Sequence, residues 1–245
     1  LVSDDCWREL SRKGFLNRWV INRKVKVWKR LNMTAVAPSS WMERELKKSL
    51  LWTDRKIRKI PNGIDLSTFK PIDKTEAKKI LNLPLDKKFI LFGAMSATTD
   101  HRKGYFLLKE AITKIKDKLK DVELLVYGSS SISSDNELGV TTHYAGRLRD
   151  VYSLVLFYSA ADLFLAPSLQ DNLPNTVVES LSCGTPCVSF NIGGLPDMIE
   201  HKKNGYLAKP FEVDDLSEGI LWTLKHGSSL REYARQCAVD KFSDN

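Results

Sequence analysis

From residue 87 onward, short and almost wholly apolar runs alternate with longer stretches in which apolar residues recur every three or four positions. The short runs are typical of strands buried on both faces of a parallel sheet, and the longer stretches are typical of amphipathic helices. Their alternation predicts an α/β fold, a Rossmann-like parallel sheet flanked by helices. The expected strands are 89–95, 122–128, 142–146, 163–168, 187–190 and a short one near Tyr206, and the expected helices are 104–119, 151–161, 176–182, 213–226 and 228–242.

The first quarter of the chain has a less regular pattern. It predicts a basic helix over 11–33, a strand over 34–38, a helix over 41–50 with Ser39 or Ser40 as its N-cap, and a strand before a Pro-Asn-Gly turn. Residues 1–60 hold 16 Lys and Arg against 6 Asp and Glu, so the net charge of +8 arises in this quarter. The chain begins without Met inside a charged segment, which predicts a piece of a longer protein.

Two interpretations of the basic helix stay open. Either its aromatic residues pack on a neighbouring domain, or residues 12–30 bind an anionic membrane surface or a phosphorylated acceptor. Each Lys or Arg near an anionic leaflet contributes about 1 kcal/mol, so several on one face would hold the chain there. No motif that reads DNA or RNA accompanies the charge, so no nucleic-acid partner is predicted.

The sequence also indicates a compartment. No apolar run approaches the roughly 20 residues that span a bilayer, and the N-terminal residues contain no signal-peptide core. The four cysteines form neither a disulfide framework nor a zinc pattern, and Cys183 and Cys187 are expected to be small buried side chains. These features favour the cytoplasm, with peripheral binding at the inner face of the membrane as an extension of the basic-helix hypothesis.

The segment 166–192 contains the strongest functional pattern. A polar loop follows the expected strand 163–168, Pro174 presets φ for a helical turn, and Asn172 or Asn175 is expected to cap the first amides. Gly184 is expected to end the helix in a left-handed conformation, followed by Pro186. A helix that begins at the carboxyl edge of a parallel sheet presents free amides and positive dipole, which suits an anion such as a diphosphate.

Two carboxylates flank this turn. Asp171 and Glu179 are eight residues apart, which would separate them by about 12 Å along a helix, whereas the two carboxylates of a retaining glycosidase lie about 5 Å apart. The spacing therefore favours two groups that bind different parts of one extended ligand. An internal structural role for Glu179 is the alternative.

A second phosphate site is expected after the first strand of the sheet. Arg102, Lys103 and Gly104 combine positive charge with exposed amides and close backbone approach, although an ordinary helix start has the same composition. The chain contains neither the dinucleotide GxGxxG motif nor the P-loop motif, and no cluster of metal-ligating residues is evident, so no metal is predicted.

The segment SLQDNLPNTVVESLSCGTPCVSF resembles the signature of group 1 glycosyltransferases, family 4, and PNGID followed by Phe69 and Pro71 resembles their interdomain passage. These enzymes have the GT-B fold of two facing Rossmann-like domains. The resemblance implies that residues 1–70 are a remnant of the acceptor-side domain and 71–245 the nucleotide-sugar-binding domain. The family usually has Glu where this chain has Asp171, and Arg where it has Ala94.

The resemblance also implies roles for individual residues. Lys103, Asp171 and Glu179 would carry the catalytic work: Lys103 would bind the diphosphate, Asp171 the sugar hydroxyls and Glu179 the ribose hydroxyls. The implied donor-binding residues are Arg102, Lys103, Gly104, Gly128, Arg147, Leu148, Asn172, Leu173, Pro174, Asn175 and Glu179. Tyr127, Gly128, Arg147 and Leu148 would line the nucleobase, with a purely structural role equally open.

The implied function is that of a retaining glycosyltransferase. Such an enzyme transfers a sugar from a UDP- or GDP-linked donor to a glycan or lipid-linked acceptor in polysaccharide biosynthesis and needs no separate cofactor. This chain would be the donor-binding part, which can lack activity alone. The alternative is a noncatalytic module that binds a nucleotide sugar or docks on a membrane as a scaffold.

Overall fold

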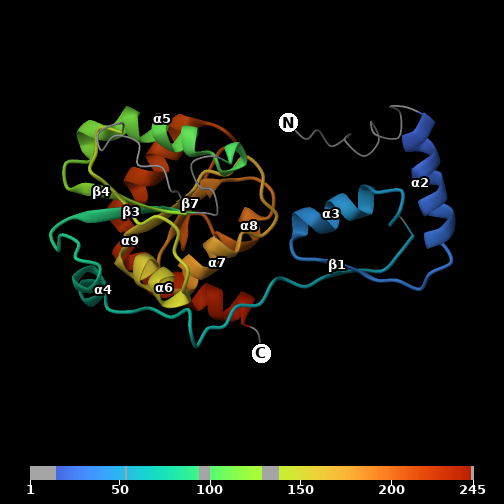
Figure 1. Ribbon diagram of the computed structural model, residues 1–245, viewed down its shortest axis with the longest axis horizontal. Helices are drawn as coiled ribbons and strands as arrows, with labels where there is room; N and C mark the ends of the chain where they lie inside the picture. The colour runs from blue at the N-terminus through green and yellow to red at the C-terminus, as the bar shows by residue number, and fades with distance from the viewer. Residues whose placement is uncertain (1–14, 53, 94–99, 129–137, 244–245) are drawn as a thin grey trace. The chain divides into compact units, whose positions relative to one another are not determined.

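The computed structural model describes residues 15–52, 54–93, 100–128 and 138–243 (Figure 1). The chain divides into two compact units, Leu1–Pro61 and Asn62–Asn245. Ile64 N–H donates to the Phe242 carbonyl at 2.8 Å, and the Arg235 guanidinium donates to the carbonyls of Leu66 and Phe69. These bonds join the segment at the start of the second unit to its last helix.

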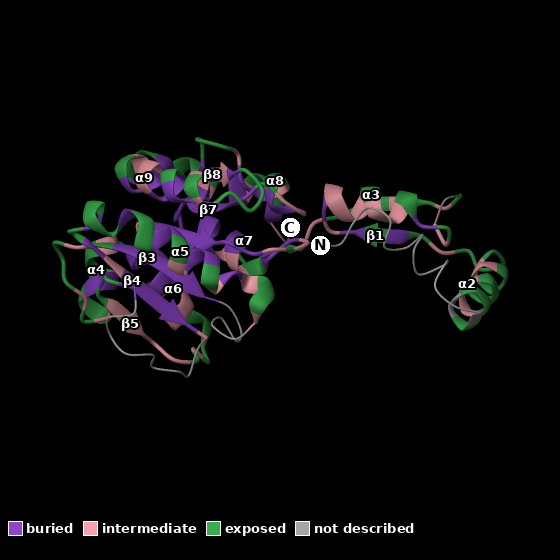
Figure 2. Cartoon of the chain, turned by 90° about the horizontal axis from the view of Figure 1, so that it is seen from above, coloured by how far each residue is buried: buried purple, intermediate pink, exposed green. Residues whose placement is uncertain are grey.

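The second unit contains the predicted parallel sheet. It has six strands in the order β5-β4-β3-β6-β7-β8, and every neighbouring pair is parallel. Most residues of β3, β4, β6 and β7 are buried, in agreement with their apolar sequences (Figure 2). The strands are β3 (Lys88–Gly93), β4 (Val122–Tyr127), β5 (Thr142–Tyr144), β6 (Leu163–Ala166), β7 (Cys187–Phe190) and β8 (Gly205–Ala208).

Helices cover both faces of this sheet and create two cores (Figure 1). Leu108 and Ile112 of α5 pack in one core, and Tyr158 of α6 and Leu181 of α7 pack in the other. The helices of this unit are α4 (Lys74–Ile80), α5 (Tyr105–Ile115), α6 (Val151–Ala160), α7 (Asn175–Ser182), α8 (Leu195–Met198) and α9 (Val213–Phe242), with 3-10 turns η1 (His101–Lys103) and η2 (Lys116–Lys118).

The sequence predicted two helices, 213–226 and 228–242, where the structure has the single helix α9. The prediction treated Gly227 as a break, but a Cβ at that position would lie 3.1 Å from the Asp162 carbonyl oxygen. Gly227 therefore permits close packing within a continuous helix. Leu216 and Ile220 join one core and Ala234 and Ala238 the other, so α9 connects the two faces.

The strand order reverses between β3 and β6. From β3 the chain moves outward to β4 and β5, and from β6 it moves the other way to β7 and β8. In open α/β sheets the loops that leave the two central strands separate at such a point and form a crevice at the carboxyl edge. In this sheet such a crevice is expected at the carboxyl ends of β3 and β6, after Gly93 and Ala166.

The first unit is a small βαβ arrangement. Strands β1 (Ala35–Ala37) and β2 (Ile57–Lys59) are parallel and are joined through α3 (Ser40–Lys48), which Ser39 caps by accepting a bond from Met42 N–H at 3.1 Å. Helix α2 (Phe15–Trp28) precedes them, and its Trp28 contacts Trp52 edge to face. Within the described residues no helix is both long and apolar enough to cross a membrane.

Candidate active site

The loop after β3 is attached to the loop after β6 by a glycine turn. Gly104 has φ of +71°, and a Cβ there would overlap the carbonyl oxygen of Pro167. Two residues before Gly104, the Arg102 carbonyl accepts a bond from Leu169 N–H at 2.8 Å. Only glycine combines this left-handed conformation with so close an approach, so the turn brings Lys103 to the β6 loop.

Lys103 and Asp171 form an ion pair in this arrangement. The distance from Nζ to Oδ2 is 2.9 Å, and the side chains are 29% and 17% exposed. The other carboxylate oxygen of Asp171 accepts a bond from Asn172 N–H at 3.0 Å. Two residues predicted separately as ligand groups are therefore direct partners.

Arg102 has a different orientation. Its guanidinium donates two hydrogen bonds to Asp100, at 3.1 and 2.9 Å, and these bonds lower the pKa of that carboxyl. The Arg102 side chain is 76% exposed. Ala94, where the family usually has Arg, lies outside the described residues.

Sequence reasoning missed two glycines that support Asp171. The Asp171 carbonyl accepts a bond from Gly194 N–H at 3.2 Å, and Gly193, with φ of +54°, lies so close that a Cβ would overlap that same oxygen. The Gly-Gly pair after strand β7 was a signal that could have identified this support, because adjacent glycines past a strand end mark a close backbone approach.

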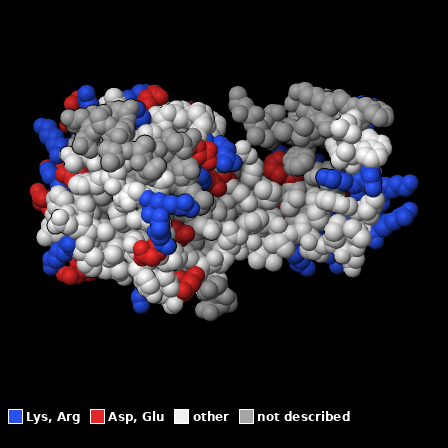
Figure 3. Space-filling model, in the orientation of Figure 1, with Lys and Arg blue, Asp and Glu red and all other residues white. Residues whose placement is uncertain are grey.

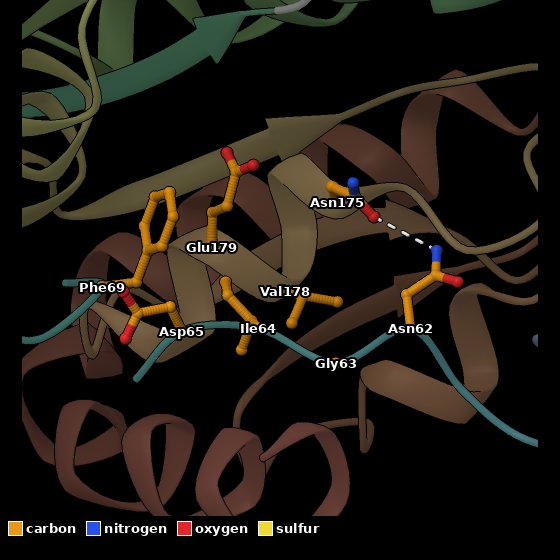
Figure 4. A pocket seen from close by; sticks show the side chains of 8 residues that line it. All are labelled: Asn62, Gly63, Ile64, Asp65, Phe69, Asn175, Val178 and Glu179. Carbon is orange, nitrogen blue, oxygen red and sulfur yellow. Dashed lines mark hydrogen bonds between the residues drawn. The ribbon is translucent and has the colours of Figure 1, made fainter. Parts of the chain in front are cut away.

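The N-terminus of α7 has no side-chain cap. The prediction that Asn172 or Asn175 would cap it is wrong: Pro174 is the N-cap residue, and the Asn175 side-chain oxygen accepts a bond from Asn62 Nδ2 at 3.3 Å (Figure 4). The C-terminus is as predicted, since Gly184 is left-handed and its N–H donates to the Leu181 carbonyl. Among the described residues no side chain accepts a bond from the first amides of α7, and a helix in this state attracts an anion.

Glu179 lies one turn into α7, in a largely buried position. Its Oε2 accepts a bond from the Tyr158 hydroxyl at 2.8 Å, and the Tyr158 hydroxyl lies 2.7 Å from that of Tyr127. Burial raises the pKa of Glu179, and the bond from Tyr158 opposes this shift. Sequence reasoning did not identify Tyr158, because an internal position in an apolar helix carries no functional signal.

A pocket of about 230 Å³ lies between α7 and the segment that starts the second unit (Figure 4). Asn175, Val178 and Glu179 line it from α7. Asn62, Gly63, Ile64, Asp65 and Phe69 line it from the other side. The PNGID segment, predicted as an interdomain passage, therefore forms one wall of a cavity beside Glu179.

The remaining predicted residues lie at or near the same sheet edge. Gly128, after β4, donates its N–H to the Gly146 carbonyl at 2.6 Å, and both glycines have positive φ. Arg147 is exposed, whereas Leu148 packs against the core that contains Tyr158. Leu173 and Pro174 are buried, so only their backbone groups could meet a ligand.

Neither metal nor thiol chemistry is evident in the part of the chain that the structure describes. There, no three His, Cys, Asp or Glu side chains are grouped so that they could hold a metal ion. Cys183 and Cys187 are buried as predicted, and burial raises the pKa of each thiol to about 12.

Comparison with known proteins gives the family. Residues 73–238 match the family model for glycosyl transferases group 1. The chain is 30% identical over 191 residues to a D-inositol 3-phosphate glycosyltransferase from Segniliparus rotundus, an alignment that covers 74% of this chain and 42% of the relative. The chain therefore spans less than half the length of that relative.

Solved structures give the same fold. Sucrose-phosphate synthase from Thermosynechococcus elongatus matches with a TM-score of 0.76 and 24% identity, covering 91% of this chain and 58% of that one. Anabaena Alr3699/HepE in complex with UDP-glucose matches with a TM-score of 0.71 and 18% identity, covering 91% and 63%. Family model, sheet topology and structural relatives agree, and the chain belongs to the group 1 glycosyl transferases with the GT-B type of α/β fold.

Proposed function

We propose that this chain is the donor-binding part of a retaining glycosyltransferase. The donor is a UDP- or GDP-linked sugar, and the acceptor is a glycan or a lipid-linked glycan in polysaccharide biosynthesis. Membership of the group 1 glycosyl transferases supports the reaction class. The second unit supplies the donor groups, and acceptor contacts belong to the domain of which the first unit is a part.

The diphosphate binds between Lys103 and the first turn of α7. Lys103 contributes a positive charge from the β3 side, and the uncapped amides contribute hydrogen bonds and dipole from the β6 side. When the sugar leaves, negative charge grows on the diphosphate, and these fixed groups stabilise it in the transition state. No covalent nucleophile on the protein is required.

The two carboxylates bind the two ends of the donor. Glu179 accepts hydrogen bonds from ribose hydroxyls, and Asp171, held beside Lys103, accepts them from the sugar. Gly128, Arg147 and Leu148 provide backbone and side-chain contacts near the nucleobase. Arg102 acts only if it leaves Asp100, so Lys103 is the main phosphate cation.

The observation that carries this proposal is the Lys103–Asp171 ion pair beside the strand switch point. It brings a phosphate-binding cation to the loop that leads into an uncapped helix and to Glu179. A side-chain cap would stabilise α7 by about 1 kcal/mol. Its absence at Pro174 is therefore better explained by ligand binding at the first amides than by a role in stability alone.

Calorimetric titration with UDP, GDP and UDP-glucose tests the proposal. One of the two nucleotides binds, and Lys103→Ala and Glu179→Ala each weaken its binding by at least about tenfold, the loss of 1.4 kcal/mol. Lys114→Ala is the matched control, because Lys114 also pairs with an aspartate, Asp214 at 2.6 Å, but lies on α5. Absence of binding to either nucleotide would overturn the proposal.

A second candidate is a noncatalytic scaffold that docks on an anionic membrane through α2, at the inner face of the cell membrane. Helix α2 contains no acidic residue, and it exposes four basic side chains together with Leu16, Trp19 and Val27. The Arg23 guanidinium lies over the Trp19 ring. Lys and Arg side chains protrude from the part of the first unit that carries α2 (Figure 3).

Flotation with anionic liposomes at physiological salt tests this second candidate. Charge reversal of Arg23, Lys24 and Lys26 to Glu abolishes co-flotation if α2 docks the chain, since each charge contributes about 1 kcal/mol. The control is the same reversal at Lys116, Lys118 and Lys120, which are exposed in the second unit. Equal retention of both variants contradicts membrane docking through α2.

A further inference from the structure

Two buried tyrosines and the partly buried Glu179, from three different elements, form one chain of hydrogen bonds. Tyr127 ends β4, Tyr158 lies inside α6, and Glu179 lies in α7. The Tyr127 and Tyr158 hydroxyls are 2.7 Å apart, and the Tyr158 hydroxyl is 2.8 Å from Glu179 Oε2. The function proposed above uses only the last member, so the two tyrosines need a separate explanation.

The directions of these bonds follow from the chemistry of the groups. An ionised carboxylate only accepts hydrogen bonds, so the Tyr158 hydroxyl donates its single proton to Glu179. Tyr158 can then only accept from Tyr127. The chain therefore runs from Tyr127 through Tyr158 to Glu179, and each hydroxyl polarises the next in the direction of the carboxylate.

As a result, one carboxylate oxygen of Glu179 accepts a hydrogen bond from within the protein, and the other can accept one from a ligand. Oε2 receives the Tyr158 proton, and Oε1 has no hydrogen bond from any residue in the described segments. Glu179 also lines the pocket beside the Asn62–Phe69 segment. A carboxylate held in this way, with its second oxygen outside the chain of hydrogen bonds, is suited to accept a hydrogen bond from a ligand hydroxyl.

The environment also selects the kind of ligand group. Among the described residues Glu179 has no ion-pair partner, and its only strong partner is a neutral phenol. An anion such as phosphate would be repelled, whereas a hydroxyl can donate at low desolvation cost. Burial alone favours the protonated form of Glu179, and the Tyr158 bond opposes protonation, so the tyrosine preserves the acceptor character of the carboxylate.

Tyr127 is itself fixed by the sheet. A Cβ added to Gly93, the last residue of β3, would overlap the Tyr127 ring, so the ring lies directly against the backbone at the strand end. The Tyr127 and Tyr158 rings meet edge to face with centroids 6.3 Å apart. The geometry of Glu179 is thus tied to the end of the central strand where the sheet order reverses.

We infer that Tyr158, supported by Tyr127, is a positioning residue that fixes Glu179 as the acceptor for a ribose hydroxyl of the nucleotide. The inference rests on the proposed donor function. Tyr158 does not touch the ligand; it engages one carboxylate oxygen of Glu179 and leaves the other able to accept a hydrogen bond.

The test compares UDP with 2′-deoxy-UDP and 3′-deoxy-UDP by calorimetry on the full chain and on its Tyr158→Phe variant. UDP is the probe because it is bound in a structure of the relative HepE; GDP and its deoxy analogues replace it if the chain binds GDP instead. The unmodified chain binds UDP about tenfold better than at least one deoxy analogue, and Tyr158→Phe loses most of that preference.

Two further variants make the experiment specific. Tyr152→Phe is the matched control: the same hydroxyl is removed from the same helix, but Tyr152 is 74% exposed, and we expect no change. Tyr127→Phe removes only the first donor of the chain, and we expect a partial loss of ribose preference, about threefold. This variant also decides the matter if Tyr158→Phe does not fold.

Each other outcome counts against the inference in a distinguishable way. If Tyr158→Phe weakens UDP and both deoxy analogues by the same factor, or leaves the preference for UDP unchanged, Tyr158 is a packing residue and the inference fails alone. If the unmodified chain binds neither UDP nor GDP, the proposed donor function fails and this inference fails with it.

Discussion

The two carboxylates that follow β6 differ in their surroundings, although eight residues separate them in the sequence. Asp171 forms an ion pair with Lys103 and accepts a bond from its neighbouring amide. Glu179 is also partly buried, but it contacts a tyrosine hydroxyl in place of a cation, and burial raises its pKa. The two carboxylates therefore lie in different settings: Asp171 is paired with a cation that a phosphate could also bind, and Glu179 can accept a hydrogen bond from a neutral hydroxyl.

The difference arises from the elements that surround each group. Asp171 lies in the loop after β6, and the Gly104 turn places Lys103, from the segment after the neighbouring strand β3, beside it. Glu179 lies on a helix that packs in the core, where α6 offers only an aromatic side chain. The predictions below disturb one environment while leaving the other intact, in order of decreasing expected effect.

Gly104→Ala should have the largest effect, a loss of about 2–4 kcal/mol in the free energy of unfolding. The new Cβ would overlap the Pro167 carbonyl in a backbone conformation that disfavours any side chain. Urea denaturation measures the loss. Because the turn carries Lys103, the same variant should bind UDP much more weakly. Binding of uridine, which has no phosphate to contact Lys103, should change little.

Gly146→Ala is the control for this prediction. Gly146 also has positive φ, but no atom of the described residues lies within 4 Å of the Cβ that would be added there. It should lose only about 1 kcal/mol, the cost of the left-handed conformation. Equal losses in the two variants would mean that contact with Pro167 contributes nothing.

Lys103→Met should reduce the affinity for UDP by about 100-fold while preserving the fold, since a charge-assisted contact to phosphate contributes about 1.5–3 kcal/mol. Uridine should bind almost as well as before. Calorimetry with both ligands separates the phosphate contribution from the nucleoside contribution. A similar loss for uridine would indicate that Lys103 supports the site as a whole.

Much of this arrangement could be predicted from the sequence. The apolar runs predicted the sheet because parallel strands that are buried on both faces consist almost wholly of apolar residues. Gly184 predicted the end of α7 because the left-handed conformation there favours glycine. Lys103 was predicted as a phosphate-binding group because Lys-Gly at a helix start combines positive charge with exposed amides, and Asp171 was predicted as a ligand group because it flanks the turn before the helix. Both roles stay predictions.

Other features depend on tertiary contacts that no local pattern reveals. Tyr158 is one apolar-looking position among many in α6, and only the packing of α6 on α7 gives its hydroxyl a partner. Gly227 looks like a helix end, yet it permits α9 to pass the Asp162 carbonyl. The missing cap on α7 was also beyond prediction, because Asn175 faces Asn62, a residue far away in the sequence.

Glu179→Gln should raise the midpoint of thermal unfolding at pH 7 by about 2–4 °C, the shift that 1 kcal/mol produces in a chain of this size. Burial raises the pKa of Glu179 in the folded state, so ionisation costs stability as pH rises through that pKa. Glutamine has no such cost and still offers an oxygen to the Tyr158 hydroxyl. Near pH 3, well below the ordinary Glu pKa of 4.5, the carboxyl is protonated in both folded and unfolded chains, and the advantage should vanish.

The result would also sharpen the contrast between the two carboxylates. A variant that is more stable but binds UDP less well would identify Glu179 as a group that is retained for binding at a cost in stability. If Glu179→Gln instead lowers the midpoint temperature of thermal unfolding at pH 7, the ionised carboxylate stabilises the fold. The assignment of Glu179 to the ligand would then lose its main physical support.

Asp171→Asn should have the smallest effect and an opposite sign, a gain of about threefold in UDP affinity, or ~0.65 kcal/mol. The change removes the carboxylate that competes for Lys103, so the ammonium can approach the diphosphate at lower cost. Asparagine keeps an oxygen for Asn172 N–H, which preserves the loop. UDP-glucose should not share the gain if Asp171 also accepts bonds from the sugar, as the proposed function requires. Asp214→Asn, which breaks the Lys114 pair on the surface, is the control and should change neither affinity. If Asp171→Asn weakens the binding of UDP as much as that of UDP-glucose, the carboxylate holds Lys103 in its binding position. Asp171 and Glu179 would then have different partners, but both would contribute to binding of the nucleotide.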